Sequence, residues 1–356
     1  MRLTLLRAIL YTFFSIIHCW GQQNVSPVSV SYSLLKKHVY LLASDSLQGR
    51  ATGTKGQLQA AFYCSATFRR NHLATVFPID STRRSFRQTY PFTITEVANF
   101  GSAGAYRVTS PAYKRYELAP LPLTAKDSSH VLFGDNVAGA LIGTDLKQEV
   151  VIVSAHYDHL GRNGSRIFHG ADDNASGTAT VLSVAAVFDS LSQRGIKPRR
   201  TIMFVLFSGE EGGLLGSEYF VRNSPIPLSQ FVCDLNVDMV GRVDNAHRKN
   251  PDYCYLLRGD QVNELQKIAE VANQQSVNLT LNQDGYDTKN DPERYFYRSD
   301  HYNFARIGIP ALFFTNGSHN DYHQPSDTAD KINYEVLQKR ATLLFQTAWL
   351  AASPAP

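Results

Sequence analysis

The feature that most constrains the fold of this chain is a series of apolar runs that each end at acidic residues or histidines. Between residues 150 and 241 the chain reads VVIVSAHYDHLG, HGADDNASGTA, IMFVLFSGEEGG and CDLNVDMVG. Buried parallel strands read as continuous apolar runs, and ligands bind beyond the carboxyl ends of such strands. Histidine and carboxylate side chains suit zinc or a similar divalent ion. The stretch therefore predicts a metal-dependent hydrolase.

Strand patterns alternate with helical patterns along the chain, which predicts one α/β domain with a mostly parallel central sheet flanked by helices. Residues 86–129 are rich in aromatic, Thr and Val residues, which indicates short strands at an antiparallel edge. Residues 135–143 are expected to lie beside 150–155, joined by a turn at 144–148. Further strands are expected at 201–207, 231–239 and 310–315, and helices at 31–43, 58–73, 178–191, 262–273, 299–306 and 334–352.

The first 21 residues resemble a secretory signal peptide. A positively charged start precedes an apolar run, residues 8–17, that is too short to span a bilayer, and cleavage is expected near Gly21. Residues 22–356 would then be the exported domain, secreted or periplasmic, with no transmembrane segment in the mature chain. A lipid anchor through Cys19 and a buried N-terminal helix remain as alternatives.

Charge, cysteines and missing motifs exclude several classes of protein. The formal net charge of +4 is not concentrated on one element, which argues against a nucleic-acid-binding protein. The chain has no GxSxG, so an α/β serine hydrolase is not supported. GRATGTK lacks the spacing of a phosphate loop and follows a helix rather than a strand. Cys64, Cys233 and Cys254 cannot all pair with one another, and their pairing stays open.

The first candidate site residues stand in the motif HYDH. His156 and Asp158 face the same side of a strand end, because alternate residues of a strand do so. A metal-bound histidine usually donates its other ring N–H to a carboxylate, and Asp158 is placed to accept it. His159 is expected on the opposite side and is left out of the site.

The remaining candidates follow later strands. Asp172-Asp173 and Glu210-Glu211 are adjacent carboxylates, of which one could hold a metal and the other serve a second role. Asp238 ends an apolar strand, where burying it without a cation would be costly. Two histidines stand in SHNDYHQPSDT, and one of them, His319 or His323, is expected to be a ligand.

The order of these motifs resembles the di-zinc exopeptidases of the secreted aminopeptidase type, metallopeptidase family twenty-eight. The resemblance runs from residue 41 to the last helix and implies a zinc-exopeptidase, phosphorylase/hydrolase-like fold with two zinc ions per chain. It implies that Asp172 bridges the two ions. The full set of zinc ligands that it implies is His156, Asp172, Glu211, Asp238 and His323.

The same resemblance implies the catalytic groups. Glu210 matches the general base, Asp158 stands behind the ligand His156, and Tyr322 matches a tyrosine that supports the transition state. The implied activity is that of an exported aminopeptidase that hydrolyses the N-terminal residue of peptide or aminoacyl substrates with a free N-terminus, using a metal-bridging water.

Several alternatives to this reading remain. A glutaminyl cyclase with a single zinc has a related scaffold, but its relatives tend to lack the histidine of HxD, which is present here as His156. A non-catalytic binding ectodomain is disfavoured by the complete ligand set. The family also contains other exopeptidases, and cobalt or manganese could replace zinc.

Overall fold

The structure is a computed structural model that describes residues 28–96, 114–122, 130–259, 264–282, 291 and 293–355. The expected signal peptide and Cys19 lie outside these residues, as does part of the loop expected at 285–298.

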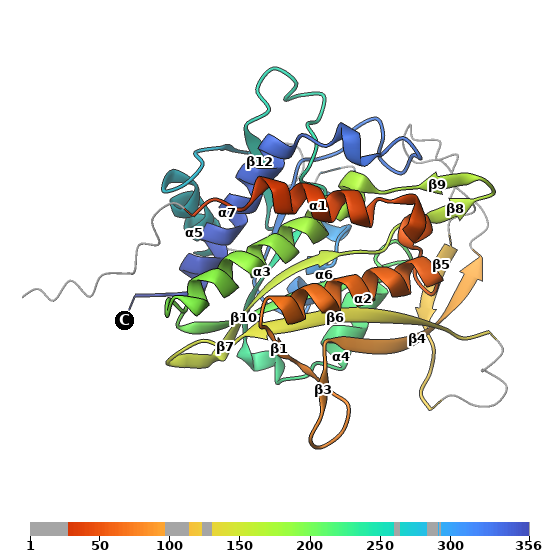
Figure 1. The fold of residues 1–356 in the computed structure, drawn as a ribbon, viewed down its shortest axis with the longest axis horizontal. Coiled ribbons are helices and arrows are strands. Elements are labelled where there is room, and N and C mark those ends of the chain that lie inside the picture. Colours follow the sequence, from red (N-terminus) through yellow and green to blue (C-terminus); the bar gives the residue numbers. More distant parts are fainter. Residues whose placement is uncertain are drawn as a thin grey trace, which may run out of the picture.

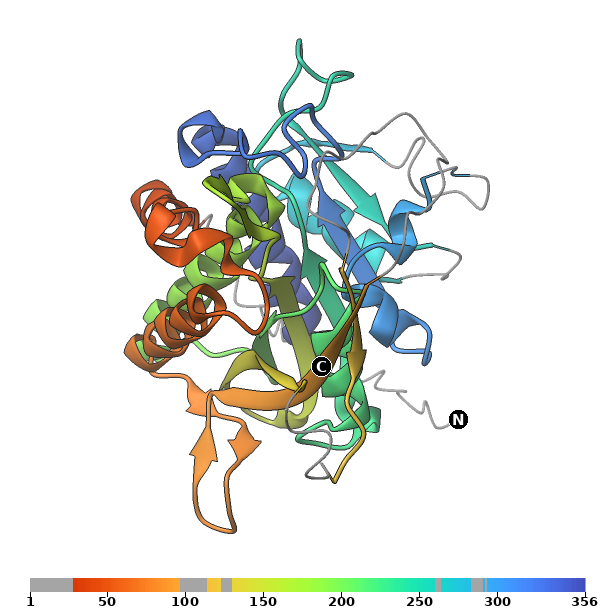
Figure 2. The same cartoon turned by 90° about the vertical axis from the view of Figure 1, so that its right-hand side faces the viewer.

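A mixed sheet of ten strands forms the centre of the molecule, in the order β13-β12-β14-β11-β7-β10-β6-β4-β5, with β1 paired to β6 (Figures 1 and 2). The four middle strands run parallel to one another. They are β14 (Ala311–Thr315), β11 (Phe231–Val237), β7 (Leu146–His156) and β10 (Arg200–Phe207). Their apolar sequences fit strands buried on both faces. The predicted α/β fold is confirmed, with its parallel part at the centre.

Antiparallel pairs extend the sheet on both sides. One side carries β6 (Leu132–Leu141), β4 (Arg87–Glu96) and β5 (Lys114–Leu118), and this is the antiparallel edge that the sequence predicts. Beyond β14 lie β12 (Tyr253–Leu257) and β13 (Thr280–Asn282). The short strand β1 (Ala74–Thr75) also pairs with β6.

The expected pairing of residues 135–143 with 150–155 is wrong. These residues belong to β6 and β7, and β10 lies between the two strands, antiparallel to β6 and parallel to β7. A strand buried on both faces has no water to bond its backbone, so β10 satisfies its N–H and C=O groups by taking a partner on each edge. This arrangement follows from long-range pairing, which the local turn pattern does not report.

Helices cover both faces of the sheet. One face carries α1 (Tyr32–Leu42), α2 (Lys55–Arg70), α3 (Gly177–Gln193) and α7 (Tyr334–Ala352), with α5 (Glu264–Gln274) packed against α7 (Figures 1 and 2). The opposite face carries α4 (Leu215–Arg222) and α6 (His301–Ala305). Both helix layers pack apolar side chains on the sheet, so the central strands are buried on both sides.

The remaining elements are short. They are the ribbons β2 (Phe77–Pro78) with β3 (Arg84–Ser85) and β8 (Gly161–Asn163) with β9 (Arg166–Phe168), and the turns η1 (Asp45–Arg50), η2 (Ala171–Ser176), η3 (Leu228–Gln230), η4 (Tyr295–Tyr297) and η5 (Ala329–Lys331).

The helical segment Ala171–Gln193 is the one segment, among the residues that the structure describes, that is long and apolar enough to cross a membrane. Most of it is buried inside the fold, so its apolar composition is explained by the core. The same interior holds Cys64, Cys233 and Cys254, which are buried and not joined in disulfides.

The four parallel strands end at one level. In the registered pairs, Phe207 of β10 lies beside His156 of β7, and Val237 of β11 lies beside Phe314 of β14. The segments that leave these strands therefore start from one edge of the sheet. Residues that are far apart in the sequence meet there.

Candidate metal centre

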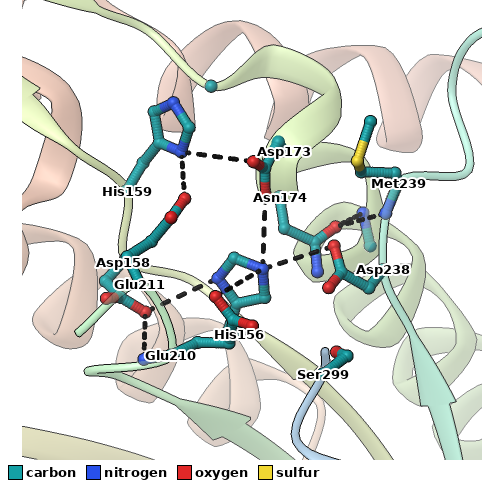
Figure 3. A network of polar contacts seen from close by, with 12 residues as sticks. His156, Asp158, His159, Asp173, Asn174, Glu210, Glu211, Asp238, Met239 and Ser299 are labelled. Atoms are coloured by element: carbon teal, nitrogen blue, oxygen red, sulfur yellow. Dashed lines mark hydrogen bonds and ion pairs between the residues drawn. The ribbon is translucent and has the colours of Figure 1, made fainter. Parts of the chain in front are cut away.

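Five segments bring acidic and histidine side chains to this carboxyl edge. His156 ends β7, Glu210 and Glu211 follow β10, and Asp238 follows β11. Asp173 comes from η2, ahead of α3, and His323 comes from the loop after β14. Figure 3 shows His156 at the centre of the group, between the carboxylates of Asp173 and Asp238.

The first half of the site surrounds the ring of His156. Its Nε2 lies 3.3 Å from Asp238 Oδ1, 3.4 Å from Asp173 Oδ1 and 3.9 Å from Glu210 Oε2. On the other side of the ring, Nδ1 lies 3.5 Å from Asp158 Oδ1, so Asp158 stands behind His156 as the sequence predicts. Asp158 accepts hydrogen bonds from the Thr52 hydroxyl at 2.9 Å and from the Glu210 backbone N–H at 3.3 Å.

The second half of the site surrounds His323. Its Nε2 lies 3.0 Å from Asp173 Oδ2 and 3.2 Å from Glu211 Oε2. The two oxygens of Asp173 thus face different histidines, Oδ1 toward His156 and Oδ2 toward His323. One carboxylate is shared between the two halves, and it is that of Asp173.

The expectation that Asp172 is the shared carboxylate is therefore corrected. Asp172 Oδ1 accepts the Gly241 N–H at 2.6 Å, and its Oδ2 lies 3.1 Å from His319 Nε2, outside the group around His156. The backbone N–H groups of Asp172 and Asp173 both donate to Asp327 Oδ2, which fixes η2 so that the two side chains point to different partners. Of the two downstream histidines, His323 joins the site and His319 holds Asp172.

The structure adds His159, which the strand pattern placed on the opposite side. Its Nδ1 lies 2.6 Å from Glu211 Oε1 and 3.8 Å from Asp173 Oδ2 (Figure 3). Because β7 ends at His156, the alternation of a strand no longer applies three residues later. The second histidine of HYDH was the only signal for this residue in the sequence.

Burial and charge shape the protonation of the group. Burial lowers the pKa of His156, but the Asp238 and Glu210 carboxylates raise it well above its usual range. His323 is also buried, yet Glu211 and Asp173 raise its pKa to about 10. Burial raises the pKa of Glu210 well above its usual range, and the charges of Glu211 and Asp238 raise it further. The carboxylates of the cluster thus favour a positive charge in this buried position.

The residues fit divalent cations. Both ring nitrogens of His156 and Oδ1 of Asp238 are buried and make no hydrogen bond among the residues that the structure describes. Leaving such atoms without a partner is costly, and a cation between them would supply one. Ligand atoms of His156, Glu210 and Asp238 lie within 4.8 Å of one another, and so do those of His159, Asp173 and Glu211. Histidine nitrogen and carboxylate oxygen are the donors of catalytic zinc sites.

An open pocket adjoins the cluster. Asp173, Glu210, Asp238 and His323 line it, and Tyr322 lies with its ring stacked on His323 at 3.9 Å between centroids. The rest of the described wall consists of Met239, Tyr295, Arg298, Phe313, Thr315, Gly317 and Ser318. Glu210 and Tyr322, the expected base and transition-state donor, therefore line the same pocket.

Residues 136–348, more than half of the chain, match the model of Peptidase family M28. The chain belongs to peptidase family M28. Among sequence relatives, it is 30% identical over 219 residues to Aminopeptidase YwaD of Bacillus subtilis, a match that covers 59% of this chain and 43% of that protein. It is 29% identical over 210 residues to a probable leucine aminopeptidase of Arthroderma otae, across 57% of this chain and 54% of that protein. The M28 chain thus spans about half the length of these relatives.

Solved structures share the fold of this M28 chain. A zinc aminopeptidase from Bacillus subtilis superposes with a TM-score of 0.64 at 18% identity, covering 91% of this chain and 96% of that one. A glutaminyl cyclase of Porphyromonas gingivalis superposes with a TM-score of 0.56 at 15% identity, covering 90% and 98%. At these levels of sequence identity, the similarity shows a shared fold only.

Two fully buried arginines of the M28 chain hold the loops that carry the site. Arg50, at the end of η1, donates to the backbone carbonyls of Leu42, Tyr157, His169 and Gly170 at 2.6 to 3.0 Å. Arg340 of α7 donates to the carbonyls of Tyr253, Val240 and Arg242 at 2.7 to 2.9 Å. Arg50 thus fixes the loop after His156 and the loop before η2, and Arg340 fixes the loop after Asp238.

An asparagine side chain joins the two segments that bear Asp173 and Asp238. Asn174 Nδ2 donates to the Val237 carbonyl at 2.9 Å, and its Oδ1 accepts the N–H of Met239 at 3.2 Å. The same Oδ1 accepts the N–H of Gly177 at 2.8 Å, at the start of α3. The Asn174 side chain therefore fixes the segment of Asp173 relative to that of Asp238.

Proposed function

We propose that this M28 chain is an exported aminopeptidase that binds two zinc ions and hydrolyses the N-terminal residue of peptide or aminoacyl substrates. The observation that carries the proposal is the Asp173 carboxylate, shared between the His156 group and the His323–Glu211 group, with Glu210 beside it. The proposal of export rests on the sequence of the first 21 residues. The proposed activity agrees with the names of the relatives, although this chain matches only about half of their length.

The zinc ions would be held by His156, Asp173, Glu211, Asp238 and His323. When bound, such ions lower the pKa of a water molecule and polarise a substrate carbonyl. The protein's own part in the reaction is proton transfer by Glu210, whose carboxylate faces both the cluster and the pocket. Glu210 takes the proton as the water oxygen attacks the scissile carbonyl carbon, and passes it to the leaving amine nitrogen.

Tyr322 and the acidic wall would orient the substrate. Tyr322 lines the pocket, and its hydroxyl could donate a hydrogen bond to the oxyanion of the tetrahedral intermediate. The positively charged α-amine of the substrate would sit against the carboxylates of the same wall. A peptide bond within a long chain lacks that amine, so cleavage would be restricted to the first residue.

Replacing the base tests this proposal. The Glu210→Gln protein should keep its zinc but lose turnover of aminoacyl chromogenic amides by at least about a hundredfold, because a positioned general base contributes about 10²- to 10⁴-fold. Glu218→Gln is a matched control, since Glu218 lies on α4 outside the described pocket wall. Wild-type turnover by the Glu210→Gln protein would refute the assignment.

A glutaminyl cyclase is the second candidate, favoured by the fold shared with the Porphyromonas gingivalis enzyme. The two candidates differ in metal content and product. Two zinc ions per chain with release of free N-terminal amino acids would support the peptidase. One zinc with ammonia released from peptides that begin with glutamine would support the cyclase.

A further inference from the structure

Arg298 is the one lysine or arginine side chain in the described part of the pocket wall. It follows η4 and is about one third exposed, at 36% of its side-chain surface. Its Nη2 donates a hydrogen bond to the Tyr322 hydroxyl oxygen at 3.1 Å. The mechanism outlined above uses Tyr322 but assigns nothing to Arg298.

The guanidinium of Arg298 lies near two tyrosine rings. It lies 4.9 Å from the ring centroid of Tyr295 and 5.8 Å from that of Tyr322, distances at which a cation is attracted to an aromatic face. The Tyr295 hydroxyl is itself hydrogen-bonded to Ser318 Oγ at 2.6 Å. These contacts favour one position of the guanidinium before any substrate arrives.

Hydrogen bonds to Asp291 also anchor the turn that precedes Arg298. Asp291 accepts the backbone N–H groups of Tyr295 at 2.8 Å and Glu293 at 2.9 Å. Glu293 in turn lies 3.6 Å from Arg298 Nη1, with 47% of its side chain exposed. Exposed ion pairs of this kind contribute little to stability. Among the polar contacts of the guanidinium within the described residues, the hydrogen bond to Tyr322 is therefore the more important one.

The direction of the hydrogen bond determines what Tyr322 can do. Arginine is a donor only, so the Tyr322 oxygen must accept from it. The single hydroxyl hydrogen of Tyr322 is then not spent on Arg298 and stays available to the pocket that both residues line. The nearby positive charge also makes the hydroxyl a stronger hydrogen-bond donor. The ring of Tyr322 is also stacked on that of His323.

We propose that Arg298 is a positioning residue that orients the Tyr322 hydroxyl as a hydrogen-bond donor toward the substrate oxyanion. The proposal rests on the proposed peptidase function. Arg298 acts through Tyr322 and makes no contact of its own with the reacting atoms. Its removal should lower kcat and leave KM nearly unchanged, because the interaction is strongest with the charge that develops in the transition state.

A double-mutant cycle on the zinc-loaded protein tests the proposal. Loss of a donor to an oxyanion costs about 10²- to 10³-fold in kcat. We expect Tyr322→Phe to fall in that range, Arg298→Met to lose at least about tenfold in kcat with KM within about threefold, and Arg298→Lys to recover part of the loss. In the Tyr322→Phe background, Arg298→Met should cost less than about twofold.

The control is Arg294→Met. Arg294 lies on the same loop with its guanidinium over the Tyr297 ring at 4.7 Å, but it does not line the described pocket. It should leave kcat and KM unchanged. Unchanged zinc content and circular dichroism of all variants separate the effect from misfolding.

Two outcomes overturn the proposal. An Arg298→Met loss of equal size with and without the Tyr322 hydroxyl would mean that Arg298 acts independently of it. A rise in KM with unchanged kcat would make Arg298 a substrate-binding residue.

A readout without catalysis separates this proposal from the function on which it rests. In zinc-free protein labelled with ¹³C at the tyrosine ring carbon that bears the hydroxyl, the Tyr322 resonance is the one that disappears in Tyr322→Phe. Arg298→Met should shift that resonance and Arg294→Met should not. If the resonance shifts but the zinc-loaded wild-type protein shows no peptidase activity, the contact is kept and the function is refuted. An unmoved resonance would refute the contact itself.

Discussion

Replacing Arg50 by methionine should destabilise the fold by about 3 to 5 kcal/mol, the usual result of breaking a buried charged contact. Burial lowers the pKa of Arg50 only to about 10, so the guanidinium is charged at neutral pH. Its four hydrogen bonds to carbonyls would each contribute about 1.5 to 3 kcal/mol, as bonds to a charged group do. The cost of burying the charge offsets part of this sum, and methionine recovers some packing.

Urea unfolding of the metal-free protein, followed by circular dichroism, measures this free energy. Arg50→Lys should fall between wild type and Arg50→Met, because lysine keeps the charge but has fewer donors in a different geometry. Arg83→Met is the control, since the Arg83 side chain is 72% exposed and pairs only with Asp80 among the described residues. An Arg50→Met protein within about 1 kcal/mol of wild type would show that the carbonyls find other partners, and would refute the reasoning.

Two further predictions concern aspartates. Asp173→Asn should release zinc from dialysed protein, while Asp172→Asn should retain it, because Asp173 faces both His156 and His323 and Asp172 faces neither; equal metal contents of the two variants would contradict the correction made above. Burial raises the pKa of Asp234 to about 8, against about 3.9 in an unfolded chain. Between these values the folded protein keeps a proton that the unfolded chain has released, so this residue lowers stability by about 1.4 kcal/mol for each pH unit of increase. Asp234→Asn keeps an acceptor for Ser154 and should remove that dependence, which urea midpoints at pH 5 and pH 8 would measure; an unchanged difference between the two midpoints would contradict it.

The sequence predicted the parts of the site that depend on local patterns. Apolar runs located the central strands, and residues directly at or after their ends, such as His156 and Asp238, were correctly brought to one edge. His323 was separated from His319 by the family resemblance, and the geometry agrees. These successes share one physical basis, since a buried parallel strand has both a recognisable composition and a defined end.

The errors arose where the backbone leaves regular structure. The orientation of Asp172 and Asp173 depends on η2, which Asp327 fixes from 154 to 155 residues away in the sequence. His159 was misplaced by extending the alternation of a strand beyond its end. The position of β10 between β6 and β7, like the partners of Arg50, follows from contacts between distant segments that no local window contains.

The residues that line the pocket stand on elements of very different stability. His156 and Asp238 adjoin strands with hydrogen-bonded neighbours on both edges, so moving them would require the sheet itself to open. Tyr295 stands on η4 and Arg298 directly follows it. This single turn is anchored by Asp291, and such turns open at lower free energy than a core strand. Residues of this turn that do not contact Tyr322 can therefore change and reshape what enters the pocket, while the cluster beneath it stays as it is.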